Sequence, residues 1–571
     1  MSGQPAARPP ADAAGGVRSV QITAGAGGRL CGSCLHDNAL VKALRARGRD
    51  AILVPAYVPT TTDEESVAER RIVMGGVNVW LQQQVPLFRR TPAWIDRLLD
   101  ARPLLEWLSA GTGSARPADL GPLTVSALEG EQGHQRKEVA KLAAWLAADV
   151  RPDVVHLSNA LLLGVARSVR AATGARIVCT LSGEDIFVDA IPEPHRGRIW
   201  GLLRERAADV DAFVALNEFF AGFMAGRLGV PRERIAVIPH GVDLGAFPAT
   251  APDLAARRRA RGGRLVVGYL ARACREKGLD QLVRALPGLA ARHDAEVVAA
   301  GAEVAAERGY VAECAALAEE LGVADRFRWL GQVDRGAKLA FFGSVDVFAM
   351  PTAHPEAKGL PVIEALAAGV PVVAPRHGAF PELLDGERAG LLHAPSDPAD
   401  LAVKLAAVLD DGALAARLGA HGHATARARH SAERMAAAHE SLYATCLRRL
   451  AVVLVGVAVA AGTACTPVAE PAASKIGFDL SSLDAEGLAG ASDGKVAVSY
   501  EFRIPDTPEN RAAVQGIDPG IEITAGPRGR VDAGPGFCLC IGSTHRPRHR
   551  EILLELSRLP FVERIVRCDF E

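Results

Sequence analysis

The chain has 571 residues and a formal net charge of −1; 49% of its residues are hydrophobic and 23% are charged. This composition is typical of a soluble globular protein of about three or four domains, and it lacks the basic excess of nucleic-acid-binding proteins. Aromatic residues make up 5% and the chain has ten cysteines, which argues against an RNA-stacking surface and against a disulfide framework.

The first 16 residues, MSGQPAARPPADAAGG, form a polar tail that we expect to be disordered. The tail has no apolar region of the kind that a secretory signal requires. We therefore expect the first 450 residues to be cytoplasmic.

From residue 17 onward, strands and helices are predicted to alternate. Continuous Val, Ile and Leu runs indicate strands that are buried on both faces, and the alternation with helices indicates a parallel sheet. The segment 58–133 is predicted to be irregular apart from a helical piece at 93–110. Strands are expected at 19–24, 51–57, 153–159, 176–182, 211–217 and 234–241, and helices at 34–48, 134–150, 160–174 and 218–229.

A second series of strands follows a segment rich in Pro, Gly and Arg at 242–263, where we place a domain boundary. Its strands are expected at 265–271, 296–301, 327–331, 347–351, 371–375 and 391–395. The fold class is therefore α/β, with two doubly wound Rossmann-like domains at 17–243 and 244–425 and a closing helix at 426–449. Ligands of such sheets bind at the carboxyl ends of the strands, which places a cleft between the two domains.

The character of the chain changes after Arg449. An uncharged, mostly apolar run at 450–464 leads to Cys465, a linker to 474 and a small α+β segment at 475–571 whose role is unassigned. The run resembles a lipoprotein signal or a tether that would hold the chain at the inner face of a membrane, but it is short for a membrane span. The alternative is an accidental fusion of neighbouring reading frames.

One motif, PTAHPEAKGLPVIEALAAGVPVVAP, places two glutamates around the start of a helix. Glu356 is expected in the loop after a buried strand, and Glu364 one turn into the helix. The amides of Gly359 and Leu360 are free at the helix start and can hold an anion or a sugar oxygen, with Lys358 beside them. The alternative is a pair of surface glutamates around an ordinary helix.

A second motif, LVVGYLARACREKGLDQLVRAL, places Arg272 and Lys277 around a short loop between a strand and a helix. Two cations at a helix start suit a pyrophosphate leaving group, whose charge needs stabilisation as its bond breaks. The alternative is a solvated basic turn.

These motifs, together with FRWLGQVDRGAKLAFFGSVDVFAMPT and VIPHGVDLGAFP, resemble the retaining glycosyltransferases of GT-B fold, family four (glycosyl transferases group 1), over about residues 18–447. The resemblance implies that Arg272 and Lys277 grip the donor diphosphate. It also implies that Glu356 contacts the transferred sugar and that Glu364 holds the ribose. Further donor contacts are implied for the chain at Gln332 and Val333, beside the base, and for the loop of Gly27 and Gly28, over the phosphates.

The resemblance implies transfer of a hexose from a nucleotide diphosphate sugar to an acceptor hydroxyl, with no metal and no cofactor. Two positions depart from the family pattern, because Ser182 stands where a histidine is usual and His240 where an asparagine is usual. One alternative is a GT-B sugar-nucleotide epimerase, in which Asp185 with His156 or His36 would be the acid/base pair.

The stretch GAGGRLCGSCLHDNAL holds glycines followed by Cys31 and Cys34. The preferred interpretation is a glycine loop that closes on the donor, with both cysteines as packing residues. A redox pair, in a binding protein of another class, is the alternative; a zinc site is weakened because no second Cys-x-x-Cys pair lies in these domains. His36 either faces the cleft or is an exposed polar residue.

Overall fold

The computed structural model describes residues 16–25, 31–91, 117–262, 264–303, 307, 309–461, 475–478, 480, 483–484, 486–489, 495–525, 536–559 and 561–568. The chain divides into two compact units, Met1–Val455 and Gly456–Glu571, which are described separately. The predicted helical piece at 93–110 lies outside the described residues.

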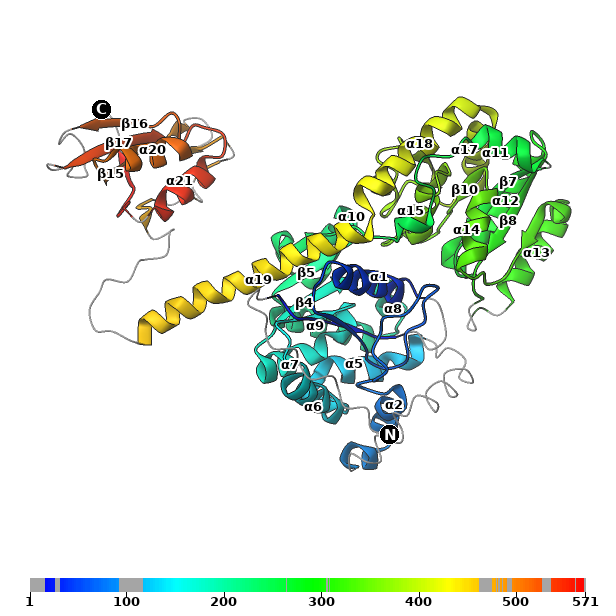
Figure 1. Ribbon diagram of the computed structural model, residues 1–571, viewed down its shortest axis with the longest axis horizontal. Helices are drawn as coiled ribbons and strands as arrows, with labels where there is room; N and C mark the ends of the chain where they lie inside the picture. Colours follow the sequence, from blue (N-terminus) through cyan, green and yellow to red (C-terminus); the bar gives the residue numbers. More distant parts are fainter. Residues whose placement is uncertain are drawn as a thin grey trace. The chain divides into compact units, whose positions relative to one another are not determined.

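The first sheet of the larger unit has six parallel strands in the order β2-β1-β3-β4-β5-β6, and Figure 1 labels β4 and β5 in it. The strands lie where the apolar runs predicted them, and nearly all of their side chains are buried, which is typical of a sheet covered on both faces. Their bounds are β1 Ser19–Thr23, β2 Ala51–Pro55, β3 Val154–Leu157, β4 Arg176–Leu181, β5 Ala212–Ala215 and β6 Ile235–Val237.

Helices cover both faces of this sheet. One face packs against α1 and α19, and the other against a larger group of helices that includes α6, α7 and α10. Asn217 caps α10 by accepting a hydrogen bond from the Phe220 amide at 2.9 Å. The bounds are α1 Gly32–Ala46, α6 Arg136–Trp145, α7 Ala166–Thr173, α10 Glu218–Leu228 and α19 Ala432–Ala461.

The expectation that 58–133 is irregular was wrong in part, because α2 (Gly76–Gln84) and α5 (Gly121–Glu129) lie there. Two further helices, α8 (Glu184–Asp189) and α9 (His195–Arg206), follow β4. These four helices are short or weakly amphipathic, and α5 owes its place to packing against α9. Local periodicity in the sequence is too weak to predict such helices.

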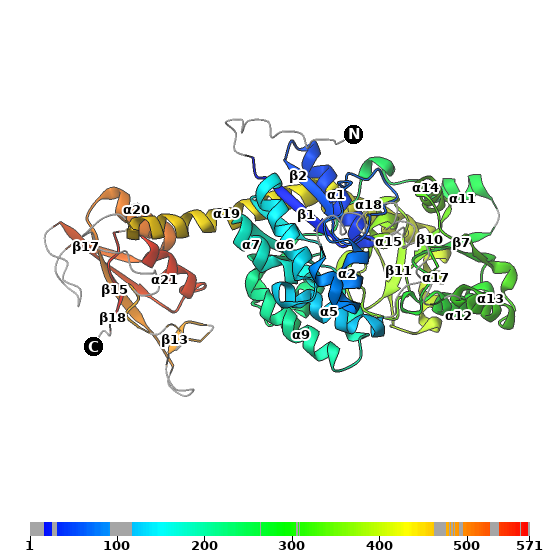
Figure 2. The same ribbon diagram turned by 90° about the horizontal axis from the view of Figure 1, so that it is seen from below.

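The second sheet also has six parallel strands, in the order β12-β11-β10-β7-β8-β9. Figure 2 shows it beside the first sheet within the larger unit. Its two faces are covered by α14, α15 and α18 on one side and by α12, α13 and α17 on the other. The strands are β7 Leu265–Leu270, β8 Ala295–Ala300, β9 Phe327–Trp329, β10 Val347–Ala349, β11 Val372–Pro375 and β12 Gly390–His393; the helices are α12 Leu279–Ala290, α13 Tyr310–Glu320, α14 Arg335–Ser344, α15 Leu360–Ala367, α17 Pro398–Asp410 and α18 Gly412–Arg429.

The polypeptide returns from the second sheet to the first through α18 and α19. Met435, Ala436 and Tyr443 on α19 join the core that α1 forms with the first sheet. The α19 helix does not end at Arg449 but continues to Ala461. Over the described residues, no helix combines the length and the apolar character that a membrane crossing requires.

The smaller unit contains an antiparallel sheet in the order β16-β17-β15-β18 and two helices. The chain order is strand, helix, two strands, helix and strand, and with this sheet order it is the split β-α-β arrangement of ferredoxin-like folds. The bounds are β15 Ser499–Pro505, α20 Pro508–Ile517, β16 Glu522–Ala525, β17 Phe537–Ser543, α21 His549–Arg558 and β18 Val566–Cys568.

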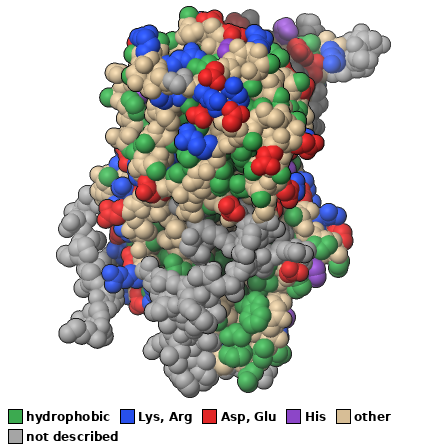
Figure 3. Space-filling view, turned by 90° about the vertical axis from the view of Figure 1, so that its right-hand side faces the viewer, with side chains coloured by type: hydrophobic (Ala, Val, Ile, Leu, Met, Phe, Trp, Pro, Cys, Tyr) green, Lys and Arg blue, Asp and Glu red, His purple; other side chains and the backbone are tan. Residues whose placement is uncertain are grey.

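Charged side chains of both signs lie among one another on the face drawn in Figure 3. Ion pairs between side chains of opposite charge occur in the domain of the second sheet. Arg264 lies 2.8 Å from Asp325, and Arg326 lies 2.7 Å from Asp294. Exposed pairs of this kind contribute little to stability.

Candidate active site

Lys277 and Glu356 come from different loops at the carboxyl ends of β7 and β10 and form an ion pair. Lys277 ends a short 3-10 turn, Arg275–Lys277, and Gly278 follows it with a φ of +70°. A Cβ at Gly278 would lie 1.9 Å from the Pro351 carbonyl oxygen, so only glycine lets the two loops approach this closely. The predicted cation and carboxylate are thus brought together.

The carboxylate of Glu356 is held in its charged form. Burial alone would raise its pKa, but the charge and hydrogen bond of Lys277, with the Lys358 amide at 3.1 Å, lower the pKa to about 2. Glu356 therefore stays ionised at neutral pH and acts as a hydrogen-bond acceptor rather than as a proton donor.

The same loop reaches across to the first sheet. Lys358 Nζ donates to Ser33 Oγ at 2.8 Å, and Asn217 Nδ2 donates to the Ala357 carbonyl at 2.7 Å. His354 Nε2 lies 3.5 Å from Asp185 Oδ2. The carboxyl ends of the two sheets therefore face each other, with the Glu356 loop between them.

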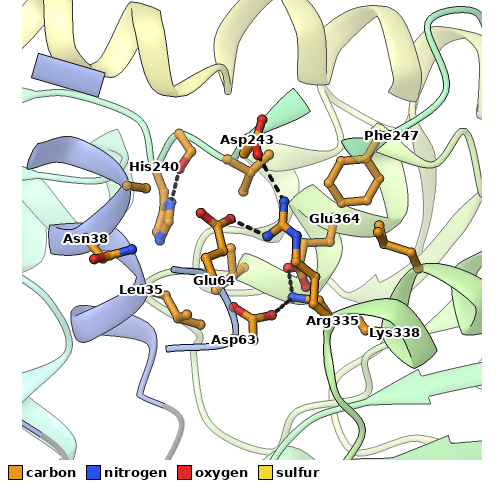
Figure 4. Close-up of a pocket in the computed structure, with 15 residues that line it drawn as sticks. Leu35, Asn38, Asp63, Glu64, His240, Asp243, Phe247, Arg335, Lys338 and Glu364 are labelled. Carbon is orange, nitrogen blue, oxygen red and sulfur yellow. Dashed lines mark hydrogen bonds and ion pairs between the residues drawn. The ribbon is translucent and has the colours of Figure 1, made fainter. Parts of the chain in front are cut away.

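A pocket lies beside this loop, and Figure 4 shows its charged side chains. Lys338 on α14 lies between Glu364 on α15 and Asp63 of the first domain, with 2.5 Å from its Nζ to each carboxylate. Arg335, one turn earlier on α14, is paired with Glu64 and, at 3.1 Å, with Asp243.

These ion pairs nearly fill the pocket, whose remaining volume is about 30 Å³. Pockets that hold drug-sized ligands measure about 300–1,000 Å³, so a ligand of that size would fit here only if the Asp63–Glu64 segment withdrew. Sequence reasoning missed Asp63, Glu64, Arg335 and Lys338. A basic pair three residues apart on one face of the helix in DRGAKLAFF was the only signal for α14.

Glu364 lies one turn into α15, as the sequence predicted, and it lines the pocket. Burial raises its pKa, against the opposing charge and hydrogen bond of Lys338. Its carboxylate is therefore less firmly ionised than that of Glu356.

The other predicted donor residues are placed as follows. Gly359 precedes α15 with a φ of +64°, and Leu360 lines the pocket. Arg272 is exposed at the end of β7, and Val333 is partly buried against the core of the second domain. Gly27 and Gly28 lie outside the described residues.

Two histidines suggested as acid/base candidates are enclosed in the first domain. His36 is buried, with its ring 5.0 Å from that of His240, so the expectation of an exposed polar residue was wrong. His156 is buried and both of its ring nitrogens have partners, Tyr443 Oη and Thr180 Oγ1, each at 2.7 Å. Asp185 is also buried, at the edge of the cleft near His354.

Cys31 and Cys34 lie at the start of α1, next to the Lys358 contact. Among the described residues, the side chains close enough to share an ion are those of Cys274, Glu276 and Glu307, a group to which this cysteine pair does not belong. Cys179, Cys274 and Cys314 are all buried.

The chain is similar to family models and to characterised proteins. A family model described as Glycosyl transferases group 1 matches residues 252–425, and one described as Glycosyltransferase Family 4 matches residues 114–246. A D-inositol 3-phosphate glycosyltransferase of Xylanimonas cellulosilytica is 34% identical over 45% of this chain and 62% of its own length. A GDP-mannose-dependent alpha-(1-6)-phosphatidylinositol monomannoside mannosyltransferase of Mycolicibacterium smegmatis is 31% identical over 44% of this chain and 66% of its own length. The matches thus span less than two thirds of these relatives.

Solved structures agree with the two-domain architecture. Sucrose-phosphate synthase from Thermosynechococcus elongatus superposes with a TM-score of 0.55 at 19% identity, covering 76% of this chain and 100% of its own. The Anabaena protein HepE in complex with UDP gives 0.53 at 18%, covering 75% and 100%. At this identity the likeness concerns the fold, which is GT-B. Through residues 114–425, the chain belongs to the group 1 glycosyltransferases.

Proposed function

We propose that the protein is a retaining glycosyltransferase that moves a hexose from a nucleotide diphosphate sugar to an acceptor hydroxyl. The observation that carries the proposal is the Lys277–Glu356 pair, held at the carboxyl ends of β7 and β10 and facing the first domain. The pair brings a cation that can bind the leaving diphosphate next to a carboxylate that can bind the sugar.

The chemistry follows from these charges. As the bond to the diphosphate breaks, negative charge grows on the leaving phosphate, and Lys277 and Arg272 stabilise it. Glu356 accepts hydrogen bonds from hydroxyls of the sugar, and the departing phosphate takes the proton of the acceptor hydroxyl on the same face. Closure of the domains excludes water, which would otherwise hydrolyse the donor.

The nucleoside half of the donor would occupy the pocket around Glu364. Its entry requires Asp63 and Glu64 to leave Lys338 and Arg335, since the pocket is otherwise too small. Glu364 is then free to accept hydrogen bonds from the ribose hydroxyls. Binding of the donor would therefore occur together with withdrawal of the Asp63–Glu64 segment.

The epimerase alternative is less well supported by the geometry. It needs an acid/base pair in the first domain, but His156 uses both ring nitrogens in fixed hydrogen bonds. His36 is buried, with its ring packed against those of His240 and His439.

The test is a donor screen with purified protein. UDP-, GDP- and ADP-sugars, including GDP-mannose, are incubated with inositol phosphate, glycolipid and oligosaccharide acceptors, and release of the nucleoside diphosphate is measured. We expect one donor class to be turned over, with the anomeric configuration retained in the product by NMR. Turnover by the Lys277→Ala variant equal to the wild type, or an inverted product, would contradict the proposal.

A further inference from the structure

Cys31 and Cys34 lie in the first turn of a helix, in unequal surroundings. Cys31 is the N-terminal capping residue of α1, with an extended backbone (φ −130°, ψ 128°) and no capping bond from its side chain. It is partly exposed, whereas Cys34 is buried, at 1% exposure. The pair thus combines a reachable sulfur with a shielded one.

The surroundings favour a thiolate at Cys31. The hydrogen bond from the Cys34 thiol and the charge of Lys358, with amides of the first turn, lower the pKa of Cys31 to about 4, although burial opposes them. The pKa of Cys34 is raised by the same hydrogen bond and by burial. A buried packing cysteine does not need a cation beside it.

A proton acceptor for Cys34 lies close by. Thr23 Oγ1 lies 4.0 Å from Cys34 Sγ and hydrogen bonds with the Asp37 carboxylate. Asp37 is buried, and its Oδ2 has no hydrogen-bond partner among the described residues. Burial raises the pKa of Asp37 to about 7, so it can take up a proton near neutral pH.

We propose that Cys31 and Cys34 are a redox-active dithiol that a low-molecular-weight disulfide closes reversibly, and that closure alters the donor cleft. The Cys31 thiolate attacks one sulfur of the small disulfide, and that sulfur stays bonded to Cys31 as a mixed disulfide while the other sulfur leaves as a thiolate. Cys34 then attacks Cys31, its proton passes through Thr23 to Asp37, and the second small thiolate leaves. Two electrons move from the protein pair to the small disulfide, which is reduced to two thiols.

The structure also shows how closure reaches the cleft. A disulfide holds its two Cβ atoms about 3.8 Å apart, so bond formation draws Cys31, the capping residue of α1, against Cys34 and tightens the start of the helix. Ser33 lies between the two cysteines, and its hydroxyl holds Lys358 of the donor loop. Tightening therefore disturbs the contact that joins α1 to that loop. This second part rests on the proposed function.

The chemistry is tested without any activity assay. Trypsin releases both cysteines in one peptide, Leu30–Lys42, which contains no other cysteine. The reduced full-length protein is incubated with oxidised glutathione in large excess, alkylated and digested. We expect the mass of this peptide to fall by two hydrogens, because the two thiols become a disulfide. The excess of oxidised glutathione is needed because a stabilised thiolate makes the disulfide easy to reduce.

Two matched variants separate the steps. Cys34→Ser should retain one glutathione on Cys31, since no second thiol can displace it, and Cys31→Ser should acquire none, since Cys34 is buried. The proposal would be overturned if the wild-type peptide stays unmodified in the folded protein while the denatured protein reacts fully with oxidised glutathione. A glutathione that stays on wild-type Cys31, or one equivalent of zinc bound to the purified protein by this pair, would also overturn it.

The effect on the cleft is measured by titrating UDP and GDP into the reduced and oxidised forms. We expect oxidation to weaken binding of the preferred diphosphate at least several-fold, with recovery after reduction, and no change in the Cys31→Ser/Cys34→Ser variant under either condition. Equal affinity in both forms would refute the coupling while leaving the thiol chemistry standing. Failure of the reduced protein to bind any nucleoside diphosphate would instead count against the proposed function and, with it, the coupling.

Discussion

Lys277 and Glu356 depend on each other at the scale of single residues. Their side chains are nearly buried, and each neutralises a charge that would be costly to keep in the cleft alone. Glu364 and Lys338 repeat the arrangement in the neighbouring pocket, with Asp63 as a third partner. The two glutamates nevertheless have pKa values shifted in opposite directions.

The first prediction concerns Lys277, the cation that we propose binds the donor diphosphate. Lys277→Ala should lower kcat by roughly 10²–10³, as for the loss of a preorganised charge partner in the transition state. Arg284→Ala, on the exposed face of the following helix, is the matched control and should change kcat less than twofold. Steady-state kinetics with the donor found in the screen would check this, and wild-type turnover in Lys277→Ala would remove it from the site.

The second prediction concerns pH. The folded pKa of Glu356 lies below the ordinary 4.5, so its contribution to the free energy of unfolding is complete above 4.5 and disappears as pH falls toward 2. The stability difference between the wild type and Glu356→Gln should therefore shrink over that window in urea unfolding.

Glu364→Gln serves as the comparison with opposite sign. Because the folded pKa of Glu364 is raised, the wild type should lose stability relative to this variant as pH rises from 4.5 through that folded pKa. Lys338 keeps Asp63 as a partner in the variant. If the stability difference from the wild type changed with pH in the same direction for both variants, the pKa values of Glu356 and Glu364 would not be shifted in opposite directions.

At the scale of elements, the start of α15 sets the position of the Gly359 and Leu360 amides, which we propose as an anion site. Gly359 adopts a left-handed backbone, and Pro361 occupies the first turn of the helix, where its missing N–H costs no hydrogen bond. The helix itself is largely buried. The loop therefore cannot move without disturbing the core of the second domain.

The third prediction tests this turn. Gly359→Ala should destabilise the protein by about 1 kcal/mol from the left-handed backbone, plus about 1–3 kcal/mol because the new Cβ would lie 2.3 Å from Leu383 Cδ1. Gly174→Ala has the same backbone requirement with open space around it, so it isolates the first contribution. Thermal and urea unfolding measure the stability of both variants. Equal losses of stability would show that the Leu383 side chain moves aside without an energetic cost.

At the scale of the whole molecule, α19 joins the last part of the second domain to the first sheet. The side chains that bury it against that sheet extend as far as Cys446 and Leu447. Residues Gly456–Glu571 form a compact unit of their own. The enzyme core is thus complete near the end of the predicted closing helix.

The fourth prediction follows from that packing. A chain ended after Arg449 should remain folded, with donor turnover within a few-fold of the full-length protein and a similar melting temperature. A chain ended after His430 is the matched comparison and should be unstable, since it lacks all of α19. Insolubility of the 1–449 chain would show that later residues belong to the enzyme core.

Runs of Val, Ile and Leu in the sequence predict buried parallel strands, and the strands of both six-stranded sheets lie at these runs. The motifs of Lys277, Glu356 and Glu364 follow two of these strands, and the donor contacts assigned to the three residues stay predictions. The sequence could not predict α2 or α5, which are too short to be stable without tertiary contacts. Nor could it find the pairing of Asp63 with Lys338 or of Lys358 with Ser33, because these residues are far apart in the chain and meet only when the two sheets face each other. Contacts between domains depend on the relative position of rigid bodies, and only the tertiary structure decides that.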